Sequence, residues 1–178
     1  MKGYLNKSQS RLVFEPSFRY HRPVSSPFNI VLYQPVIPQN TGSIARLCAC
    51  TGASLHLIRP LGFDIDEAAV RRAGLDYWPH VGVKDYENWE DFLQKENPTE
   101  LYFLSKLAKT GFSNVRYQKP TYLVFGNEVQ GLPPEIWERY PDRFLTIPMR
   151  THLVRSLNLS QSAAVVLYEA LKQHDFPI

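Results

Sequence analysis

The fold of this 178-residue chain is decided by residues 123–133, which read LVFGNEVQGLP. An apolar, strand-like run ends there, and Gly126, Glu128 and Gly131 follow it. Glycines let the backbone approach a ligand closely, and the N–H and C=O groups of such a turn can bind the edge of an adenine. A plain strand–turn–helix connection also explains both glycines, and Glu128 is then a solvated acid. The segment predicts either a ligand-binding strand end or an ordinary turn.

Short strand-like runs alternate with segments of helical periodicity on both sides of this stretch. The expected strands are residues 28–33, 54–58, 80–84, 101–104, 122–125 and 144–147. The expected helices are one that Thr41 caps and Gly52 stops, then 66–72, 89–95 with Asn88 as its cap, 133–138 and 160–173. This alternation predicts an α/β fold with a mostly parallel sheet flanked by helices.

Basic residues are concentrated at the N-terminus. Residues 1–27 carry five basic residues and one acid, Glu15, whereas the whole chain has a net charge of +3, so residues 28–178 are nearly neutral. We expect residues 1–27 to be a flexible extension, with an organelle transit peptide as the alternative, and residues 28–178 to form one domain. A neutral body does not bind long nucleic acids by charge alone, so any RNA must be held by local patches.

Several classes of protein lose support from the sequence. The glycine motifs of dinucleotide and phosphate-loop sites and the nucleophile elbow of hydrolases do not occur. The five histidines lack metal-ligand spacing, and no apolar run approaches the roughly 20 residues of a membrane span. Cys48 and Cys50 point to different faces of a helix, so we expect no disulfide, no metal and a reducing cytoplasm.

Two further segments are dense in polar and small residues. The first, residues 35–46, brings Asn40 to the start of a helix and places Arg46 opposite its apolar stripe, within reach of a phosphate or ribose. The second, residues 147–164, supplies Ser156, Asn158 and further hydroxyls around another helix start. For each segment taken alone, a capped helix is a sufficient explanation, and for the first of them it is the favoured one, with Arg46 as a solvated cation.

Together the three segments resemble the SPOUT methyltransferases, whose three motifs occur here in the same order. The run RRAGLDY at residues 71–77 is similar to the tRNA wobble 2′-O-methyltransferases within that class. The resemblance covers about residues 28–173. It implies a deep trefoil knot in the C-terminal part, which is a rare exception to the rule that chains are unknotted.

The resemblance also implies a cofactor, a substrate and a set of functional residues. S-adenosylmethionine is expected at the knot, in contact with Leu104, Gly126, Ile147 and Ser156. The expected catalytic residues are Arg46, Asn40, Glu128 and Asn158. Arg46 is given an electrostatic role toward the ribose and its phosphate, because arginine stays protonated and is a poor base. The others orient it, the cofactor or the nucleotide.

The implied substrate is the ribose of cytidine or uridine 34 in the anticodon region of a tRNA, with a leucine tRNA as the candidate. The family works as a homodimer. Lys106, Lys109, Arg71 and Arg72 are either contacts to RNA phosphates or ordinary surface charges. Three alternatives stay open: a ribosomal RNA ribose methyltransferase, a cofactor-binding RNA chaperone without catalysis, and a nucleotide-dependent oxidoreductase.

Overall fold

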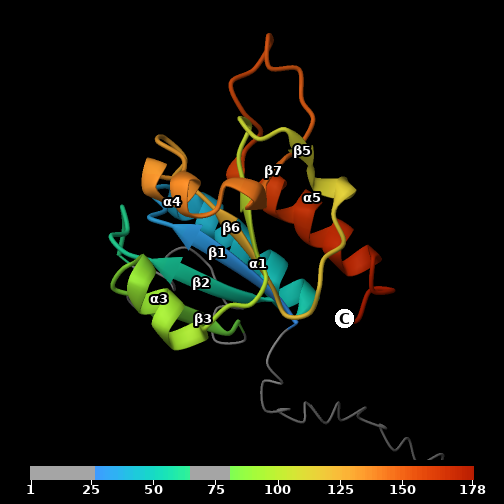
Figure 1. Ribbon diagram of the computed structural model, residues 1–178. Coiled ribbons are helices and arrows are strands. Elements are labelled where there is room, and N and C mark those ends of the chain that lie inside the picture. The colour runs from blue at the N-terminus through green and yellow to red at the C-terminus, as the bar shows by residue number, and fades with distance from the viewer. Residues whose placement is uncertain (1–26, 65–80) are drawn as a thin grey trace, which may run out of the picture.

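The computed structural model describes residues 27–64 and 81–178. The predicted extension, the predicted helix at residues 66–72 and the run at residues 71–77 lie outside the described residues. Figure 1 shows the elements in their order along the chain. They are β1 (Phe28–Tyr33), α1 (Pro38–Thr51), β2 (Ser54–Ile58), β3 (Val83–Tyr86), α3 (Trp89–Glu96), β4 (Leu101–Leu104), β5 (Thr110–Gly111), β6 (Thr121–Phe125), α4 (Pro134–Arg139), β7 (Phe144–Thr146) and α5 (Leu159–Lys172).

The strands form one sheet in the order β3-β2-β1-β6-β4-β7-β5, and every neighbouring pair is parallel. This confirms the predicted α/β fold with a parallel sheet. Two strands enter between strands made earlier in the sequence: β6 lies between β1 and β4, and β7 lies between β4 and β5. The trefoil knot in this C-terminal part stays a prediction. The two-residue strand β5 was not predicted, since a run this short carries no periodicity.

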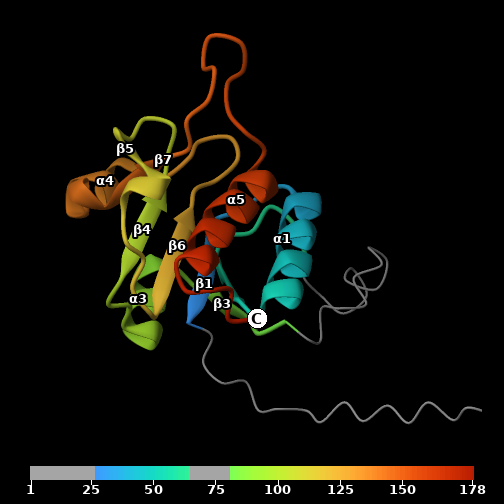
Figure 2. The ribbon, with the colours of Figure 1, turned by 90° about the vertical axis from the view of Figure 1, so that its right-hand side faces the viewer.

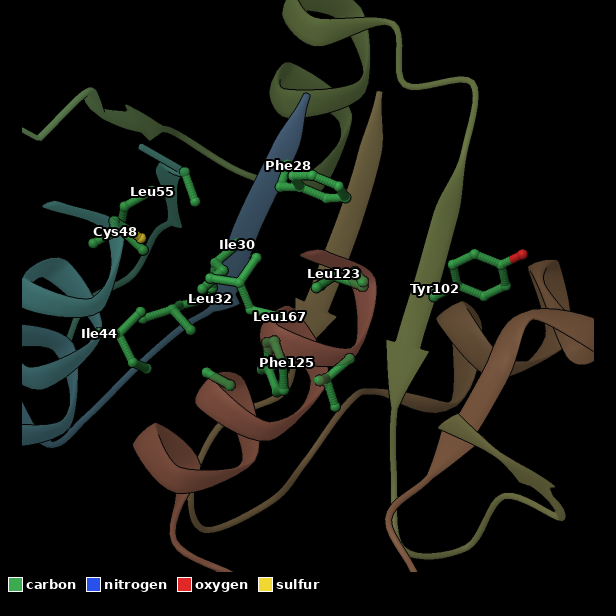
Figure 3. Packing of buried hydrophobic residues seen from close by; sticks show 14 of the residues in the cluster. Phe28, Ile30, Leu32, Ile44, Cys48, Leu55, Tyr102, Leu123, Phe125 and Leu167 are labelled. Atoms are coloured by element: carbon green, nitrogen blue, oxygen red, sulfur yellow. The ribbon is translucent and has the colours of Figure 1, made fainter. Parts of the chain in front are cut away.

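Helices cover both faces of the sheet, and each face has its own apolar core. On one face α1 and α5 pack together over β1, β2 and β6 (Figure 2). Side chains at alternate strand positions fill this core, among them Ile30, Leu32, Leu123 and Phe125 beneath Leu167 of α5 (Figure 3). The intervening positions point to the other face, where α3 and α4 pack. Because both faces are buried, the strands are almost continuously apolar.

The start of α1 differs from the prediction. The helix begins at Pro38, after an extended Ile37, and Thr41 is therefore buried inside its first turn rather than capping it. Proline is well accommodated at this first position because the missing N–H has no partner there in any case. The expected stop is confirmed, since Gly52 closes the helix in the left-handed conformation at φ 70°. The strand expected at residues 80–84 is found at Val83–Tyr86.

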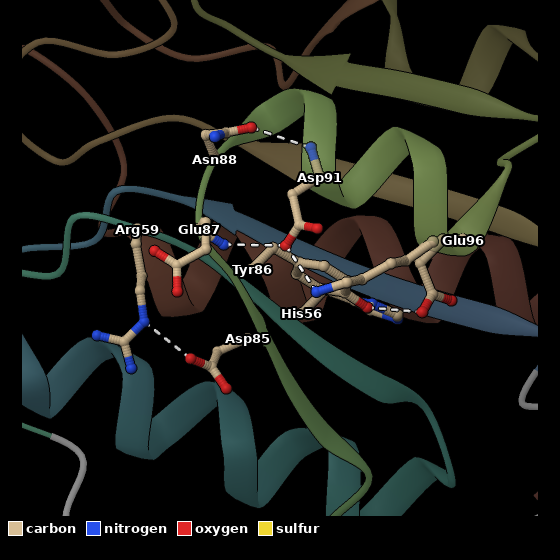
Figure 4. Close-up of polar contacts among 9 residues, drawn as sticks. His56, Arg59, Asp85, Tyr86, Glu87, Asn88, Asp91 and Glu96 are labelled. Atoms are coloured by element: carbon tan, nitrogen blue, oxygen red, sulfur yellow. Dashed lines mark hydrogen bonds and ion pairs between the residues drawn. The ribbon is translucent and has the colours of Figure 1, made fainter.

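A buried polar network joins the β2–β3 edge of the sheet to α3 (Figure 4). The ring nitrogens of His56 lie 2.8 Å from the Tyr86 hydroxyl and 3.1 Å from Oδ1 of Asn29. The Tyr86 hydroxyl donates to Glu96 at 2.7 Å, and the Lys84 ammonium donates to the same carboxylate at 2.9 Å. Burial is the main reason that the pKa of His56 is lowered to about 4; the Glu96 charge opposes this shift, and the Lys84 charge adds to it. His56 is therefore neutral near neutral pH.

Because of this network, the free energy of unfolding depends on pH in the acidic range. The ordinary pKa of histidine is 6.5, so as the pH falls from there toward 4 the unfolded chain takes up a proton that folded His56 does not. The contribution of this group to the free energy of unfolding is complete above 6.5 and is lost as the pH falls through about 4. Urea denaturation at several pH values should show the wild type losing its advantage over His56→Gln across this range. A constant difference between the two proteins contradicts the assignment.

Candidate active site

Three loops leave the carboxyl edge of the sheet side by side. Leu104 at the end of β4 is in register with Phe125 at the end of β6 and with Leu145 of β7. The loops that continue through Gly126 and Ile147 therefore start next to Leu104. Leu104 and Ile147 are both partly buried against the same core cluster. The structure thus brings together three of the four residues predicted to contact a cofactor, at the edge where open parallel sheets bind their ligands.

Gly126 is required by the close approach of the turn that follows it. A Cβ placed there would lie 2.3 Å from the carbonyl carbon of Gly131, a distance that real Cβ atoms do not show. The chain reverses direction directly after Gly126. Asn127 and Gly131 exchange backbone hydrogen bonds, and Gly131 adopts the left-handed conformation at φ 76°. Only glycine fits at Gly126, and the turn is held against the strand end.

Asn127 ties this turn to the end of β1. Its Oδ1 accepts hydrogen bonds from the backbone N–H groups of Val129 and Gln130, at 2.8 and 3.2 Å. Its Nδ2 donates to the carbonyl of Gln34 at 2.8 Å, and Gln34 itself has a positive φ of 50°. Sequence reasoning did not select Asn127. An asparagine directly after a strand-ending glycine is typical of such turns, so the signal was present.

Glu128 is not a solvated turn acid. Its carboxylate accepts hydrogen bonds from the backbone N–H groups of Val36 and Ile37, at 2.9 and 3.3 Å, and from Nδ2 of Asn40 at 3.1 Å. These donors lie about 90 residues earlier in the chain, in the loop between β1 and α1 and in the first turn of α1. The turn after β6 therefore holds the N-terminal end of α1.

Asn158 continues this contact to α5. Its Nδ2 donates to Oδ1 of Asn40 at 2.9 Å, and its own Oδ1 caps the helix by accepting from the N–H and the hydroxyl of Ser160, at 2.9 and 2.7 Å. Both ends of the Asn40 amide are used, one by Glu128 and one by Asn158. We refer to Glu128, Asn40 and Asn158 as the carboxylate–amide chain. It joins three of the four predicted catalytic residues.

The two remaining predicted residues lie near this chain without being part of it. Arg46 is exposed on α1, six residues after Asn40, which places it about 9 Å further along the helix axis. Ser156 is exposed in the loop between β7 and α5. The hydroxyl of Thr41 is buried beside Asn40 and has no hydrogen-bond partner among the described residues. It is a polar group that a bound ligand can satisfy.

Neither a membrane span nor a metal site is found in the part of the chain that the structure describes. None of its helices is both long and apolar enough to cross a bilayer. Across residues 27–64 and 81–178, no three side chains of histidine, cysteine, aspartate or glutamate gather in a way that could hold a metal ion. Cys48 is buried and Cys50 is exposed on the same helix, and both thiols are free.

The chain is similar to known RNA methyltransferases. A family model described as the SpoU rRNA Methylase family matches residues 27–168. A putative tRNA (cytidine(34)-2′-O)-methyltransferase of Listeria innocua is 48% identical over 153 residues, which cover 84% of this chain and 90% of the relative.

Two solved structures extend this comparison. A structure solved for the 2-OH methylation of C/U34 on tRNA has a TM-score of 0.76 and 42% identity, covering 83% of this chain and 96% of the other. The SpoU methyltransferase AviRb of Streptomyces viridochromogenes, in complex with the cofactor AdoMet, has a TM-score of 0.71 and 25% identity, covering 86% of this chain and 63% of the other.

The geometry around Glu128 predicts the effect of replacing its carboxylate. In Glu128→Gln one acceptor oxygen becomes an amide that donates, so at least one of the three donors facing it loses its partner. We expect the free energy of unfolding to fall by about 1–3 kcal/mol. Hydrogen exchange should show faster exchange of the Val36 amide. The matched control is Glu138→Gln, an exposed acid on α4. Equal exchange at Val36 in both variants contradicts the assignment.

Proposed function

The chain belongs to the SpoU rRNA methylase family, and we propose that it methylates the ribose 2′-oxygen of the wobble nucleotide, cytidine or uridine 34, in a tRNA. The observation that carries this proposal is the convergence of three strand-end loops with the carboxylate–amide chain at one edge of the sheet. The relatives named for position 34 of tRNA favour this substrate over ribosomal RNA. A leucine tRNA stays the candidate substrate, and the cytoplasm is the proposed location.

S-adenosylmethionine is the proposed methyl donor, since a related structure holds AdoMet. Leu104 and Ile147 offer partly buried apolar surface, and the turn at Gly126 brings backbone close to them, which suits an adenine ring. Ser156 completes the proposed contacts, and the buried Thr41 hydroxyl, next to Asn40 on α1, has no hydrogen-bond partner among the described residues. When bound, the cofactor supplies an electrophilic methyl group on a positively charged sulfur.

Arg46 is the proposed group that acts on the ribose. A hydroxyl attacks a methyl carbon well only when it is aligned with the bond that breaks and can lose its proton. A guanidinium stays protonated, so Arg46 cannot accept that proton. It can instead hold the ribose and its phosphate by hydrogen bonds and stabilise the negative charge that develops on the 2′-oxygen.

Asn40, Glu128 and Asn158 are proposed to fix the helix that carries Arg46. The carboxylate–amide chain holds the first turn of α1 against the β6 turn and the start of α5. A helix is stiff along its axis, so fixing its first turn also fixes a residue about 9 Å further on. These three residues therefore act by positioning Arg46, and the loss of any one should lower turnover through misalignment.

A homodimer is proposed as the working form. Helix α5 exposes Val165 and Tyr168, with exposures of 40% and 43%, and the Phe176 ring lies 6.4 Å from the Tyr168 ring. An apolar strip of this kind on a surface helix favours a protein interface.

The mass in solution tests this proposal. Light scattering should give about twice the chain mass of 20.6 kDa. Tyr168→Glu should shift the mass toward that of a single chain, because it places a charge in the apolar strip. Gln161→Glu, at an exposed position of the same helix, should leave the mass unchanged. A wild-type protein of single-chain mass overturns the proposal.

The central test is methyl transfer by Arg46→Ala. We expect its turnover to fall by about 10²–10³-fold, while calorimetry shows S-adenosylmethionine bound as in the wild type. The measurement is nucleoside mass spectrometry of position 34 after incubation with total tRNA, with ribosomal RNA fragments as a second substrate. Arg116→Ala, an exposed arginine before β6, is the matched control.

Each alternative function has a distinct outcome in this assay. Methylation of ribosomal RNA fragments but not of tRNA identifies ribosomal RNA as the substrate. Cofactor binding without methylation of either RNA favours the chaperone. Unchanged turnover in Arg46→Ala shows that Arg46 has no part in the reaction.

A further inference from the structure

Six basic side chains of the described part of the chain form ion pairs, whereas four exposed cations gathered at the carboxyl edge of the sheet do not. The paired side chains, each within 4 Å of a carboxylate, are Arg59, Lys84, Lys95, Arg139, Arg143 and Lys172. Arg116 and Lys119, which precede β6, are also exposed without such a partner among the described residues. Lys106, Lys109, Arg150 and Arg155 have no such carboxylate among the described residues. All four side chains are exposed.

These four cations lie in two neighbouring loops. Residues 105–109 follow β4 and residues 147–158 follow β7, and the two strands are paired. The ammonium of Lys106 donates to the carbonyl of Arg155 at 3.2 Å, which joins the loops directly. Figures 1 and 2 show the second loop projecting beyond the carboxyl edge of the sheet. We call residues 105–109 and 147–158 the basic loops.

No acidic residue close to the basic loops in the sequence compensates their positive charge. No aspartate or glutamate occurs between Glu100 and Glu128, or between Asp142 and Glu169. Like charges that gather without partners repel one another and do not stabilise the fold. Such a cluster is instead suited to bind a polyanion, and its place beside Leu104 and Ile147 sets it next to the proposed methyl donor.

The tip of the projecting loop adds apolar surface to the charge. Leu153 and Val154 are 66% and 53% exposed, between Arg150 and Arg155. A double helix presents mainly phosphates and sugars to a protein, whereas an unpaired nucleotide presents both a phosphate and the apolar face of its base. The alternation of cations with apolar side chains therefore matches single-stranded RNA better than a duplex.

We propose that the basic loops form a clasp for the anticodon loop, in which the four cations bind the phosphates that flank the wobble nucleotide. This inference rests on the proposed function and assigns the part of the RNA that each loop contacts. It gives Lys106, Lys109, Arg150 and Arg155 a role in substrate binding, separate from that of Arg46 in the reaction.

The test compares two double variants that remove the same charge from opposite edges of the sheet. Lys109→Ala/Arg150→Ala removes one cation from each basic loop, whereas Arg116→Ala/Lys119→Ala removes two exposed cations that precede β6. Binding of a tRNA anticodon stem-loop is measured by fluorescence anisotropy at several salt concentrations. Each phosphate neutralised on a single strand contributes about 0.7 to the slope of log K against log salt, so the first variant should lower the slope by about 1.4.

Further measurements separate this inference from the proposed function. The basic-loop variant should raise KM for tRNA and leave both kcat and S-adenosylmethionine affinity at wild-type values. The charge-conserving variant Lys109→Arg/Arg150→Lys should keep the wild-type slope of log K against log salt. Equal slopes for the basic-loop variant and the Arg116/Lys119 control overturn the clasp while wild-type methylation stands. Lost cofactor affinity also overturns it, since Lys109 and Arg150 then serve the methyl donor and not the RNA. A wild-type protein that neither binds nor methylates tRNA defeats the proposed function itself.

Discussion

The architecture of the site depends on one carboxylate. Glu128 accepts two backbone N–H groups from the loop that precedes α1 and one side-chain amide from the first turn of that helix, and so fixes the start of α1, which has no side-chain cap. A charged acceptor in a partly buried position binds such donors more strongly than a neutral group does. Through Asn40 and Asn158 the same contact reaches the start of α5. Three segments distant in sequence are thereby held as one unit.

The sheet explains why this unit forms where it does. Since all strands run parallel, their carboxyl ends meet at one edge, and the entry of β6 between β1 and β4 places the Glu128 turn next to the β1 loop. The two apolar cores differ in their relation to the proposed site. The core beneath α1 and α5 supports the proposed site, while the core beneath α3 and α4 contains no predicted site residue. Substitutions in the second core should therefore act mainly on stability.

Much of this arrangement could be predicted from the sequence. The alternation of apolar runs and helical patterns was sufficient for the α/β class, because burial on both faces makes parallel strands continuously apolar. The resemblance selected Asn40, Glu128 and Asn158, and they proved to be in contact. Two features were beyond prediction. The order of the strands is set by long-range pairing, and α1 begins at Pro38, directly after the two residues whose N–H groups bond to Glu128 about 90 residues away.

The separation of Asn40 from Asn158, 118 positions along the chain, has a consequence for biosynthesis. During translation the residues that begin α1 leave the ribosome long before their partner on α5 has been made. Contacts between residues so distant in sequence form late and slowly. A nascent or prematurely terminated polypeptide therefore lacks an assembled centre, and only a chain completed to its last helix becomes competent.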